Sequence, residues 1–372
     1  MTPPAVPLIG DLPPGSTAAA AIALALALDA AVAEPPQELH PVAWLGSLVA
    51  RADREWSRPR LAGAAVAAVV PLLAAAAVGL AVAVAARVHP LAGLIAAGLV
   101  VFATTSLRML VSTAAEVVAA TEADLPTARE RLRSLAGRDA AALSAGEVRS
   151  AAVESAAENL ADGAVAALLA FALVAPVSLP LGAGAAAWVK AVNTLDSMLG
   201  YPGKPRGTAS ARLDDAVMWV PARASAVLLA LAALARGRGR FAGRSLADPS
   251  GSGSAASGGR RPVASLSAGR RWADAPPSPN SGWPMATLAA VLDARLEKPG
   301  VYVLNPEAAL PSVETARAGV RVVALAGVLA FALAAGLALL VGWVAPTAAS
   351  ALGLPALTLP APPVPAEVVA WY

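Results

Sequence analysis

The sequence contains no cysteine and has little charge. The absence of cysteine excludes disulfides, thiolate nucleophiles and cysteine-ligated zinc or iron–sulfur sites. Charged residues make up 14% of the 372 residues, and hydrophobic residues make up 57%. An average soluble domain has about 25% charged residues, so this chain has too little polar surface to fold as one water-soluble globule. Aromatic residues are also scarce, at 4%. Membrane spans must therefore be recognised by the length of apolar runs rather than by bulky side chains.

Several apolar runs approach the roughly 20 residues that a membrane-spanning helix needs. The clearest runs are Leu61–Ala86, Leu91–Leu107, Ala164–Ala187 and Val322–Ser350. Two further runs contain polar residues: Ser16–Ala33 carries Asp29, and Ala216–Ala235 carries Pro221 and Arg223. No Lys or Arg precedes Arg51, so Ser16–Ala33 lacks the basic region of a signal peptide and is expected to remain as a span. The expected fold class is all-α, a polytopic transmembrane helix bundle with polar motif loops.

Prolines interrupt one of these runs. Pro176 and Pro180 lie near the middle of Ala164–Ala187. Proline removes a helical N–H group and clashes with the preceding turn. This segment is therefore either a kinked span or a re-entrant pair of short helices, and the sequence leaves both open. The short connection Arg87–Pro90 predicts that the runs on either side of it form an antiparallel hairpin.

Arginine positions predict the orientation of the chain. The net charge is +3, and the arginines lie mainly between apolar runs, where membrane topology explains them better than nucleic-acid binding. The positive-inside rule places the N-terminus outside the cell membrane and the loops 34–60, 112–162 and 236–318 in the cytoplasm. We expect residues 1–345 to form a single integral membrane catalytic domain, surrounded by lipid. Its Gly/Ser-rich segment 245–267 is expected to be a flexible insertion, and 346–372 a Pro-rich tail.

Two polar motifs precede the middle of the chain. His40, in His-Pro-Val-Ala-Trp-Leu-Gly, is either a proton carrier or ligand, or an interfacial residue beside the membrane anchor Trp44. Glu154, Glu158 and Asp162 are spaced by four residues, so on a helix they form one acidic stripe. A stripe of this kind is either a solvated face or a magnesium site, since Mg²⁺ uses one or two carboxylates together with phosphate oxygens.

Two more polar motifs follow. On a helix, Lys190, Asn193 and either Asp196 or Ser197 would share one face. Next come Arg212, Asp214 and Asp215 in Ala-Arg-Leu-Asp-Asp, Arg223 in Pro-Ala-Arg, and Ser278 and Asn280 in a proline-rich loop. The basic residues can bind phosphate or serve the positive-inside rule. Carboxylates beside apolar runs are better candidates for function, because burying them without a role is costly.

In this order, the motifs resemble those of the adenosylcobinamide-phosphate synthase (CobD/CbiB) family of cobalamin biosynthesis. The matching elements are His-Pro-Val…Gly from His40, Val-Glu-Ser…Ala-Glu-Asn…Asp-Gly from Val153, Lys-Ala…Asn-Thr-Leu-Asp-Ser-Met…Gly-Tyr from Lys190, Ala-Arg-Leu-Asp-Asp from Ala211, Pro-Ala-Arg from Pro221 and Ser-Pro-Asn…Gly from Ser278. The resemblance covers roughly residues 17–345. The chain departs from the family pattern at Pro277 and Met285, where a His and an acidic residue are usual.

The resemblance implies an acid–amine ligase that joins adenosylcobyric acid to (R)-1-aminopropan-2-ol or its phosphate, with ATP as co-substrate and Mg²⁺ as cofactor. It implies a metal role for Glu154, Glu158 and Asp162. The implied catalytic residues are Lys190, Asn193, Asp196 and Asp214, and the implied ligand-binding residues are His40, Arg212, Asp215, Arg223, Ser278 and Asn280. Oligomer formation and association with other membrane enzymes of cobalamin assembly stay open.

Two other functions are compatible with the sequence. A transporter is favoured by Asp29 and Arg223 within apolar runs, but the hydropathy pattern lacks the inverted repeats typical of such proteins. A non-catalytic membrane sensor related to the same family is favoured only by Pro277 and Met285. If the protein is the enzyme, the acidic stripe, the Asn-Thr-Leu-Asp-Ser segment, the Ala-Arg-Leu-Asp-Asp segment and the Ser-Pro-Asn loop must converge at one cytoplasmic mouth of the bundle. This requirement favours a re-entrant or strongly bent pair at Pro176 and Pro180, so that Glu158 and Asp196 both face the cytoplasmic cavity.

Overall fold

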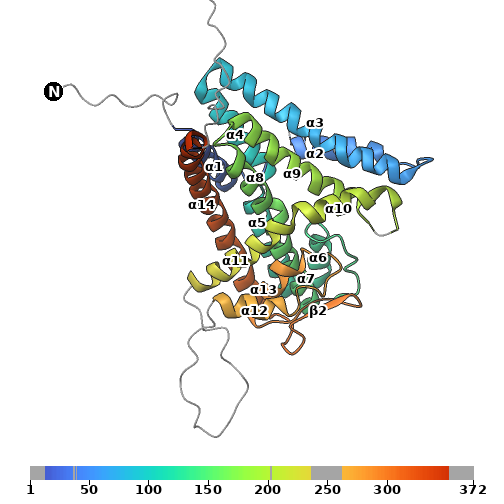
Figure 1. The fold of residues 1–372 in the computed structure, drawn as a ribbon. Helices are drawn as coiled ribbons and strands as arrows, with labels where there is room; N and C mark the ends of the chain where they lie inside the picture. The colour runs from blue at the N-terminus through green and yellow to red at the C-terminus, as the bar shows by residue number, and fades with distance from the viewer. Residues whose placement is uncertain (1–12, 37, 39, 202, 236–261, 352–372) are drawn as a thin grey trace, which may run out of the picture.

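Most of the described chain is helical, and five of its helical segments are long and apolar enough to cross a membrane. The computed structural model describes residues 13–36, 38, 40–201, 203–235 and 262–351. The five segments consist of α1 (Pro14–Val32), α3 (Pro59–Val88), α4 (Pro90–Thr104) continued by α5 (Leu107–Ala123), α7 (Ala145–Leu160) continued by η3 (Ala161–Val165) and α8 (Ala166–Val174), and α14 (Val313–Ala351). This architecture (Figure 1) confirms the expected all-α bundle of membrane-length helices.

The remaining elements connect and cover these segments. They are α2 (Pro41–Ala52), α6 (Leu125–Leu132), α9 (Leu179–Leu199), η4 (Pro205–Gly207), α10 (Thr208–Val217), α11 (Trp219–Ala235), α12 (Pro262–Arg270), α13 (Gly282–Leu292), β1 (Leu296–Lys298) and β2 (Tyr302–Leu304). The two strands form an antiparallel hairpin that pairs Lys298 with Tyr302. The segment formed by η4 and α10 meets α11 at a bend of 47°, and together they would make a sixth span or a re-entrant loop.

The run Ala164–Ala187 is not a single crossing. It divides into α8 and the first half of α9, which pack against each other across a short turn. Within the turn, Val177 N–H donates to Val174 O at 3.0 Å. A side chain at Gly182 would collide with Ala175, since an added Cβ would lie 2.4 Å from the Ala175 Cβ. The proline break therefore makes a tight helical hairpin, and the chain returns along α9 toward the level of α7.

Helix starts follow the proline positions. Helices α1, α2, α3 and α4 begin at Pro14, Pro41, Pro59 and Pro90. Proline suits the first turn because its missing N–H would have no intrahelical partner there. Only His89 separates α3 from α4, and the two helices pack together. The hairpin expected around Arg87–Pro90 is therefore confirmed.

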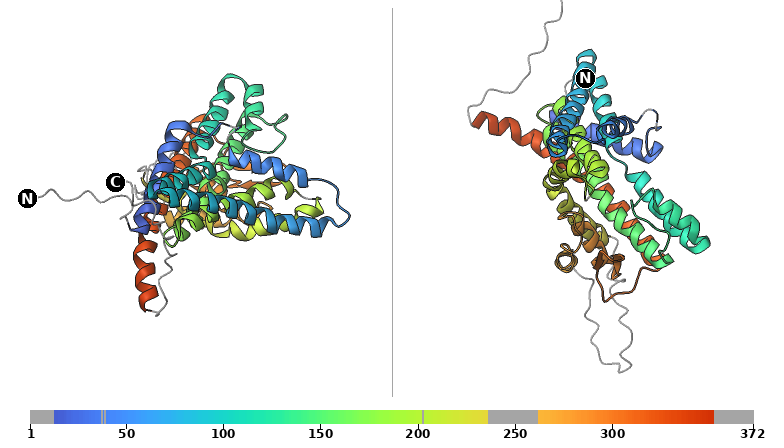
Figure 2. Two further views of the ribbon diagram at one scale, coloured as in Figure 1. Left: turned by 90° about the horizontal axis from the view of Figure 1, so that it is seen from above. Right: turned by 90° about the vertical axis from the view of Figure 1, so that its right-hand side faces the viewer.

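The helices form two groups that meet at α8 and α9. Helices α3 and α9 lie side by side, with α2 and α10 next to them (Figure 1). Gly184 permits this close packing, because an added Cβ would lie 2.9 Å from the Ala75 carbonyl oxygen. Helix α7 is buried along most of its length and packs on α5, α13, α14 and β1. Seen from two further directions (Figure 2), α5 and α6 flank one side of this second group, and α14 runs along its length.

Asp29 supports a helix break inside the bundle. The segment Pro90–Ala123 is interrupted at Thr105–Ser106, so the first N–H groups of α5 have no intrahelical partners. The Asp29 side chain is 2% exposed, and its two oxygens lie 3.0 and 3.2 Å from Arg108 N. A carboxylate there also interacts favourably with the helix dipole. This contact gives Asp29 a structural role and removes one reason for considering a transporter.

Two expected boundaries shift in the structure. Residues 245–261 of the expected insertion lie outside the described residues, and residues 262–267 belong to α12. Residues 346–351 of the expected tail belong to α14, and the rest lies outside the described residues. The helical parts of both segments were not predicted.

Candidate functional site

A polar cavity of about 430 Å³ opens between α7, α9, the proline-rich loop before α13, and the β1–β2 hairpin. It collects residues from parts of the chain that are far apart in sequence. Its polar lining residues are Arg138, Ser155, Glu158, Asn159, Asp162, Asn193, Asp196, Ser197, Tyr201, Ser278, Ser281, Lys298 and Tyr302. Three of the five polar motifs that follow residue 150 therefore face one cavity, namely the acidic stripe through Glu158 and Asp162, the Asn193–Ser197 segment and the Ser-Pro-Asn loop.

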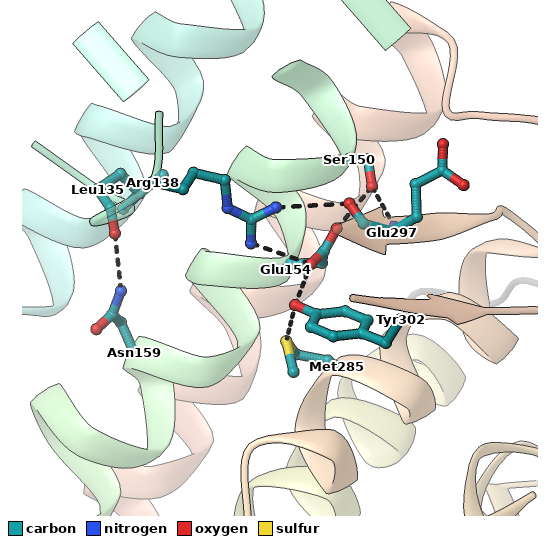
Figure 3. Close-up of polar contacts among 8 residues, drawn as sticks. All are labelled: Leu135, Arg138, Ser150, Glu154, Asn159, Met285, Glu297 and Tyr302. Carbon is teal, nitrogen blue, oxygen red and sulfur yellow. Dashed lines mark hydrogen bonds and ion pairs between the residues drawn. The ribbon is translucent and has the colours of Figure 1, made fainter. Parts of the chain in front are cut away.

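Glu154 is held by protein partners. Its side chain is fully buried, and Ser150 Oγ and Tyr302 Oη donate hydrogen bonds of 2.7 and 2.6 Å to its two oxygens. Arg138 Nη2 lies 3.2 Å from Oε2 and completes a buried ion pair. Figure 3 shows these contacts, with Ser150 also accepting the N–H of Glu297 at 2.7 Å. Glu154 thus ties α7 to the hairpin and to the turn that carries Arg138.

The pKa of Tyr302 explains the direction of its hydrogen bond. Burial and the neighbouring Glu154 carboxylate raise the pKa of the phenol above its usual value. Tyr302 therefore remains protonated at all ordinary pH values and donates to Glu154. Its ring also lines the cavity, and its hydroxyl lies 3.8 Å from the Met285 sulfur.

Glu158 and Asp162 differ from Glu154. Both line the cavity, and neither has a cation within 4.0 Å in the described part of the chain. The two carboxylates lie close enough to repel each other. The described residues contain no group of three His, Cys, Asp or Glu side chains arranged around a common metal position. A cation shared with a ligand would relieve the repulsion between Glu158 and Asp162.

Asp162 lies on an irregular turn of its helix. Residues Ala161–Val165 form a π-helical turn between α7 and α8. Such turns are rare and are frequent at functional sites, because they change the direction in which the following side chains point. The carbonyl of Gly163 accepts the N–H of Ser106 at 3.0 Å, so the break between α4 and α5 supports the turn.

The predicted face of α9 is divided between two cavities. Asn193 and Asp196 line the polar cavity, and Asn193 lies close to the carboxylates of both Asp162 and Asp214. Lys190 instead lines a second cavity of about 520 Å³, together with His40 and Glu34. The structure therefore does not bring Lys190 into the lining of the polar cavity.

The His40 side chain makes a structural contact at the start of α2. Its Nδ1 accepts the N–H of Val42 at 3.2 Å and caps α2, and its Nε2 lies 3.8 Å from Glu34 Oε2. Burial lowers the pKa of the imidazole, and Glu34 opposes this shift. The side chain is consequently mostly neutral at pH 7. Trp44, one turn later, is exposed, as expected of an interfacial anchor.

The remaining predicted residues surround the cavity without lining it. Arg212 is exposed on α10. Asp214 Oδ1 is buried and has no hydrogen-bond partner among the described residues. The backbone carbonyl of Asp215 accepts a 2.8 Å hydrogen bond from Asn280 Nδ2. Asn280 is buried and thereby joins the proline-rich loop to α10.

Arg223 fixes the same loop from the other side. Its guanidinium lies between two indole rings, 4.2 Å from the centroid of Trp219 and 4.8 Å from that of Trp283. Its Nη1 donates to Asn280 Oδ1 at 3.1 Å. Asn280 and Arg223 thus position Ser278, which does line the cavity.

Arg138, Lys298 and Tyr302 were missed by the sequence analysis. They line the cavity from a turn after α6 and from the hairpin. The signal for the hairpin was weak, because each strand has only three residues. Arg138 was counted among the arginines that set membrane orientation, and nothing in its immediate sequence indicates a buried partner.

Comparisons with known proteins agree with the motif pattern. A family model described as "CobD/Cbib protein" matches residues 22–323. The "Probable cobalamin biosynthesis protein CobD" of Methanothermobacter thermautotrophicus is 36% identical over 289 residues, which cover 76% of this chain and 85% of the relative. The "Cobalamin biosynthesis protein CobD" of Geobacter metallireducens is 36% identical over 300 residues, covering 78% and 85%. The protein of the same name from Klebsiella pneumoniae is 34% identical over 287 residues, covering 74% and 81%. No solved structure matches the chain.

Proposed function

Because the chain belongs to the CobD/CbiB family of cobalamin biosynthesis proteins, we propose that it is an ATP-dependent acid–amine ligase. Its substrates are adenosylcobyric acid and (R)-1-aminopropan-2-ol or the phosphate of that amine, and its product is adenosylcobinamide or adenosylcobinamide phosphate. The observation that supports this proposal is the single polar cavity onto which carboxylates, an amide and hydroxyls converge from three distant motifs.

Amide formation from a carboxylate needs an activated acyl group. In the first step a carboxylate oxygen of the corrinoid attacks the γ-phosphorus of ATP, the bond from that phosphorus to the bridging oxygen breaks, and ADP leaves. In the second step the amine nitrogen attacks the acyl carbon of the acyl phosphate, and the carbon–oxygen bond to phosphate breaks. The cavity accelerates both steps mainly by positioning the reactants and by stabilising charge.

Asp196 is the better candidate for the base that accepts a proton from the incoming ammonium. It lines the cavity, whereas Asp214 does not. A general base must lie within hydrogen-bond reach of the proton it removes. Asn193 and Ser278 line the same cavity and are placed to orient the substrates.

The donor set fits a magnesium ion shared with substrate. Mg²⁺ prefers one or two carboxylates and completes its shell with water and phosphate oxygens. Glu158 and Asp162 meet this requirement because both face the cavity and neither is paired with a cation within 4.0 Å in the described residues. When bound, the ion neutralises charge on the transferring phosphoryl group. Glu154 is not needed for this role, since its oxygens already bind Ser150, Arg138 and Tyr302.

Condensation of adenosylcobyric acid with the amine by the purified protein in detergent tests the proposal. We expect product only when ATP and Mg²⁺ are both present, with ADP and phosphate formed in equal amounts to the amide. Product without ATP, or no product with either form of the amine, would contradict the proposed reaction. A Glu116→Gln variant is the control, because Glu116 forms an exposed surface ion pair with Arg131.

We also propose that the protein crosses the cell membrane several times with the polar cavity on the cytoplasmic side. Five segments of membrane-spanning length and the arginine-rich loops support this placement. The chain has no cysteine, so a single Ser197→Cys variant offers one labelling site at the cavity. We expect a membrane-impermeant maleimide to label inverted vesicles and to leave intact cells unlabelled. The reverse pattern would place the cavity outside.

A further inference from the structure

One end of the polar cavity is lined by basic side chains that lie outside all the motifs identified in the sequence. Its two basic lining residues are Arg138 and Lys298. They are neighbours, since Arg138 Nη1 lies 3.5 Å from the carbonyl oxygen of Glu297, the residue before Lys298. The carboxylates of Glu158, Asp162 and Asp196 line the same cavity. The cavity therefore combines cations from one set of loops with carboxylates from the helices.

The two cations are held differently. Arg138 is fixed by its ion pair with the buried Glu154 (Figure 3). Its side chain is 11% exposed and lines the cavity. The Lys298 ammonium has neither a hydrogen bond nor an ion pair within 4.0 Å in the described part of the chain, and it interacts with the Glu158 carboxylate only at longer range. An unpaired ammonium group that lines a cavity is an attractive position for an anion, and the preorganised guanidinium beside it adds directional donors.

The turn before Arg138 adds a backbone donor. Leu135, Ala136 and Gly137 line the cavity together with Arg138. A Cβ added at Gly137 would meet nothing within 4 Å, so the space beside this residue is open. The N–H of Gly137 has no hydrogen-bond partner among the described residues, whereas that of Arg138 donates to Ala136 O at 2.8 Å. Free backbone N–H groups in such turns are typical of anion sites.

We propose that the Leu135–Arg138 turn and Lys298 bind a phosphate group of a substrate at this end of the cavity. The assignment rests on the proposed ligase reaction and deepens it. A carboxylate could be satisfied by one guanidinium, but donors from Gly137, Arg138 and Lys298 suit the several oxygens of a phosphate group. Two substrates carry such a group, the nucleotide and the phosphorylated amine. Lys190 and Arg212 do not line the cavity and so cannot take this role there.

The test measures ligand binding by the purified full-length protein in detergent, using isothermal titration calorimetry. The probes are a non-hydrolysable ATP analogue with Mg²⁺, 1-aminopropan-2-ol phosphate, and unphosphorylated 1-aminopropan-2-ol. The variant is K298Q, because removing an unpaired ammonium leaves no buried partner without its charge. The control for loss of a positive charge is R317Q, since Arg317 forms an exposed ion pair with Glu122 and neither residue lines the cavity.

We expect K298Q to weaken binding of one phosphorylated probe by about tenfold or more, because a charge-assisted hydrogen bond contributes roughly one such step. R317Q should bind every probe as wild type does, K298Q should bind the unphosphorylated amine as wild type does, and K298R should restore most of the affinity. Loss of affinity for the ATP analogue assigns the site to the nucleotide, and loss for the amine phosphate assigns it to the amine. Wild-type affinity of K298Q for both phosphorylated probes would overturn the assignment.

The phosphate site and the proposed reaction can each fail without the other. If the wild-type protein forms no amide but K298Q still binds a phosphorylated probe more weakly, the reaction is wrong and the phosphate site stands. If the wild-type protein forms amide and K298Q binds both probes normally, the reaction stands and the phosphate site is wrong. A thermal midpoint of K298Q equal to that of wild type excludes misfolding as the cause of weaker binding.

Discussion

Two glutamates one helical turn apart on α7 should respond in opposite ways to the same substitution. Glu154 is fully buried and binds Arg138, Ser150 and Tyr302, whereas Glu158 lines the cavity and has no cation within 4.0 Å among the described residues. Replacing each with Gln removes one negative charge and changes the side-chain volume little. The comparison therefore separates a structural carboxylate from a functional one on the same element.

The cost of Glu154→Gln follows from the pair it breaks. Removing one partner of a buried ion pair costs roughly 3–5 kcal/mol, mainly because the other charge stays buried without compensation. Arg138 is 11% exposed and Gln can still accept from Tyr302, so the lower end of that range, about 3 kcal/mol, is expected. Glu158→Gln breaks no ion pair and relieves its repulsion with Asp162, so its stability should stay within about 0.5 kcal/mol of wild type or rise.

Thermal unfolding of each variant in detergent, followed by tryptophan fluorescence, measures the change in stability. We expect the midpoint of Glu154→Gln to fall by several degrees and that of Glu158→Gln to remain. The condensation assay, run well below the unfolding midpoints of both variants, measures the change in catalytic activity. Folded Glu154→Gln should lose no more than about tenfold, because Arg138 keeps its charge but loses the partner that fixes it. Glu158→Gln should lose at least about a hundredfold, because one of the two carboxylates available to magnesium is gone. Equal midpoints for the two variants, or an inactive but stable Glu154→Gln, would refute the division of roles.

Three further predictions rest on single contacts. Asp29→Ala should lower stability by about 1–2 kcal/mol, measured by the same unfolding assay, because the start of α5 loses its carboxylate cap; an unchanged midpoint would contradict the capping role. Asp196→Asn should reduce amide formation by about a hundredfold or more without changing the midpoint, and retention of wild-type activity would remove Asp196 as the base. Hydrogen bonds from Lys204 and Arg206 lower the pKa of Asp53 in the folded protein. These exposed ion pairs should therefore add about 0.2–1 kcal/mol to the free energy of unfolding above pH ~4, and this contribution should disappear as the pH falls below that value. Unfolding of Asp53→Asn and wild type between pH 3 and 7 tests this sign, and a difference that grows toward low pH would contradict it.

The membrane-length helices were predictable where the sequence contains a long continuous apolar run. Apolar length identified α1, α3, α4 and α14. Hydropathy alone left the run Ala164–Ala187 open, because it does not distinguish one crossing from two antiparallel helices joined at a proline. The requirement that Glu158 and Asp196 share a site did predict the return of the chain, and both residues do line one cavity.

The parts of the site that were not predictable depend on pairing between distant segments. Tyr302 binds Glu154 across more than a hundred residues of sequence, and only the fold places the three-residue strands beside α7. Arg138 looked like one more cytoplasmic arginine, because charge counting along the sequence gives no information on burial. Asn280 was predicted to orient substrate, but its amide is used to hold Asp215 and Arg223.

Helix geometry explains why one acidic stripe divides into two functions. With 3.6 residues per turn, each step of four residues rotates the side-chain direction by about 40°, so Glu154 and Asp162 would differ by about 80° even on an ideal helix. The π-helical turn that begins at Ala161 adds a residue to the turn and changes the direction further. Glu154 therefore faces the hairpin, where Arg138 and Tyr302 bind it, while Glu158 and Asp162 face the cavity shared with α9. A spacing of i, i+4 and i+8 predicts a common face only for neighbouring members, and in this protein the second and third members form the pair available to a metal ion.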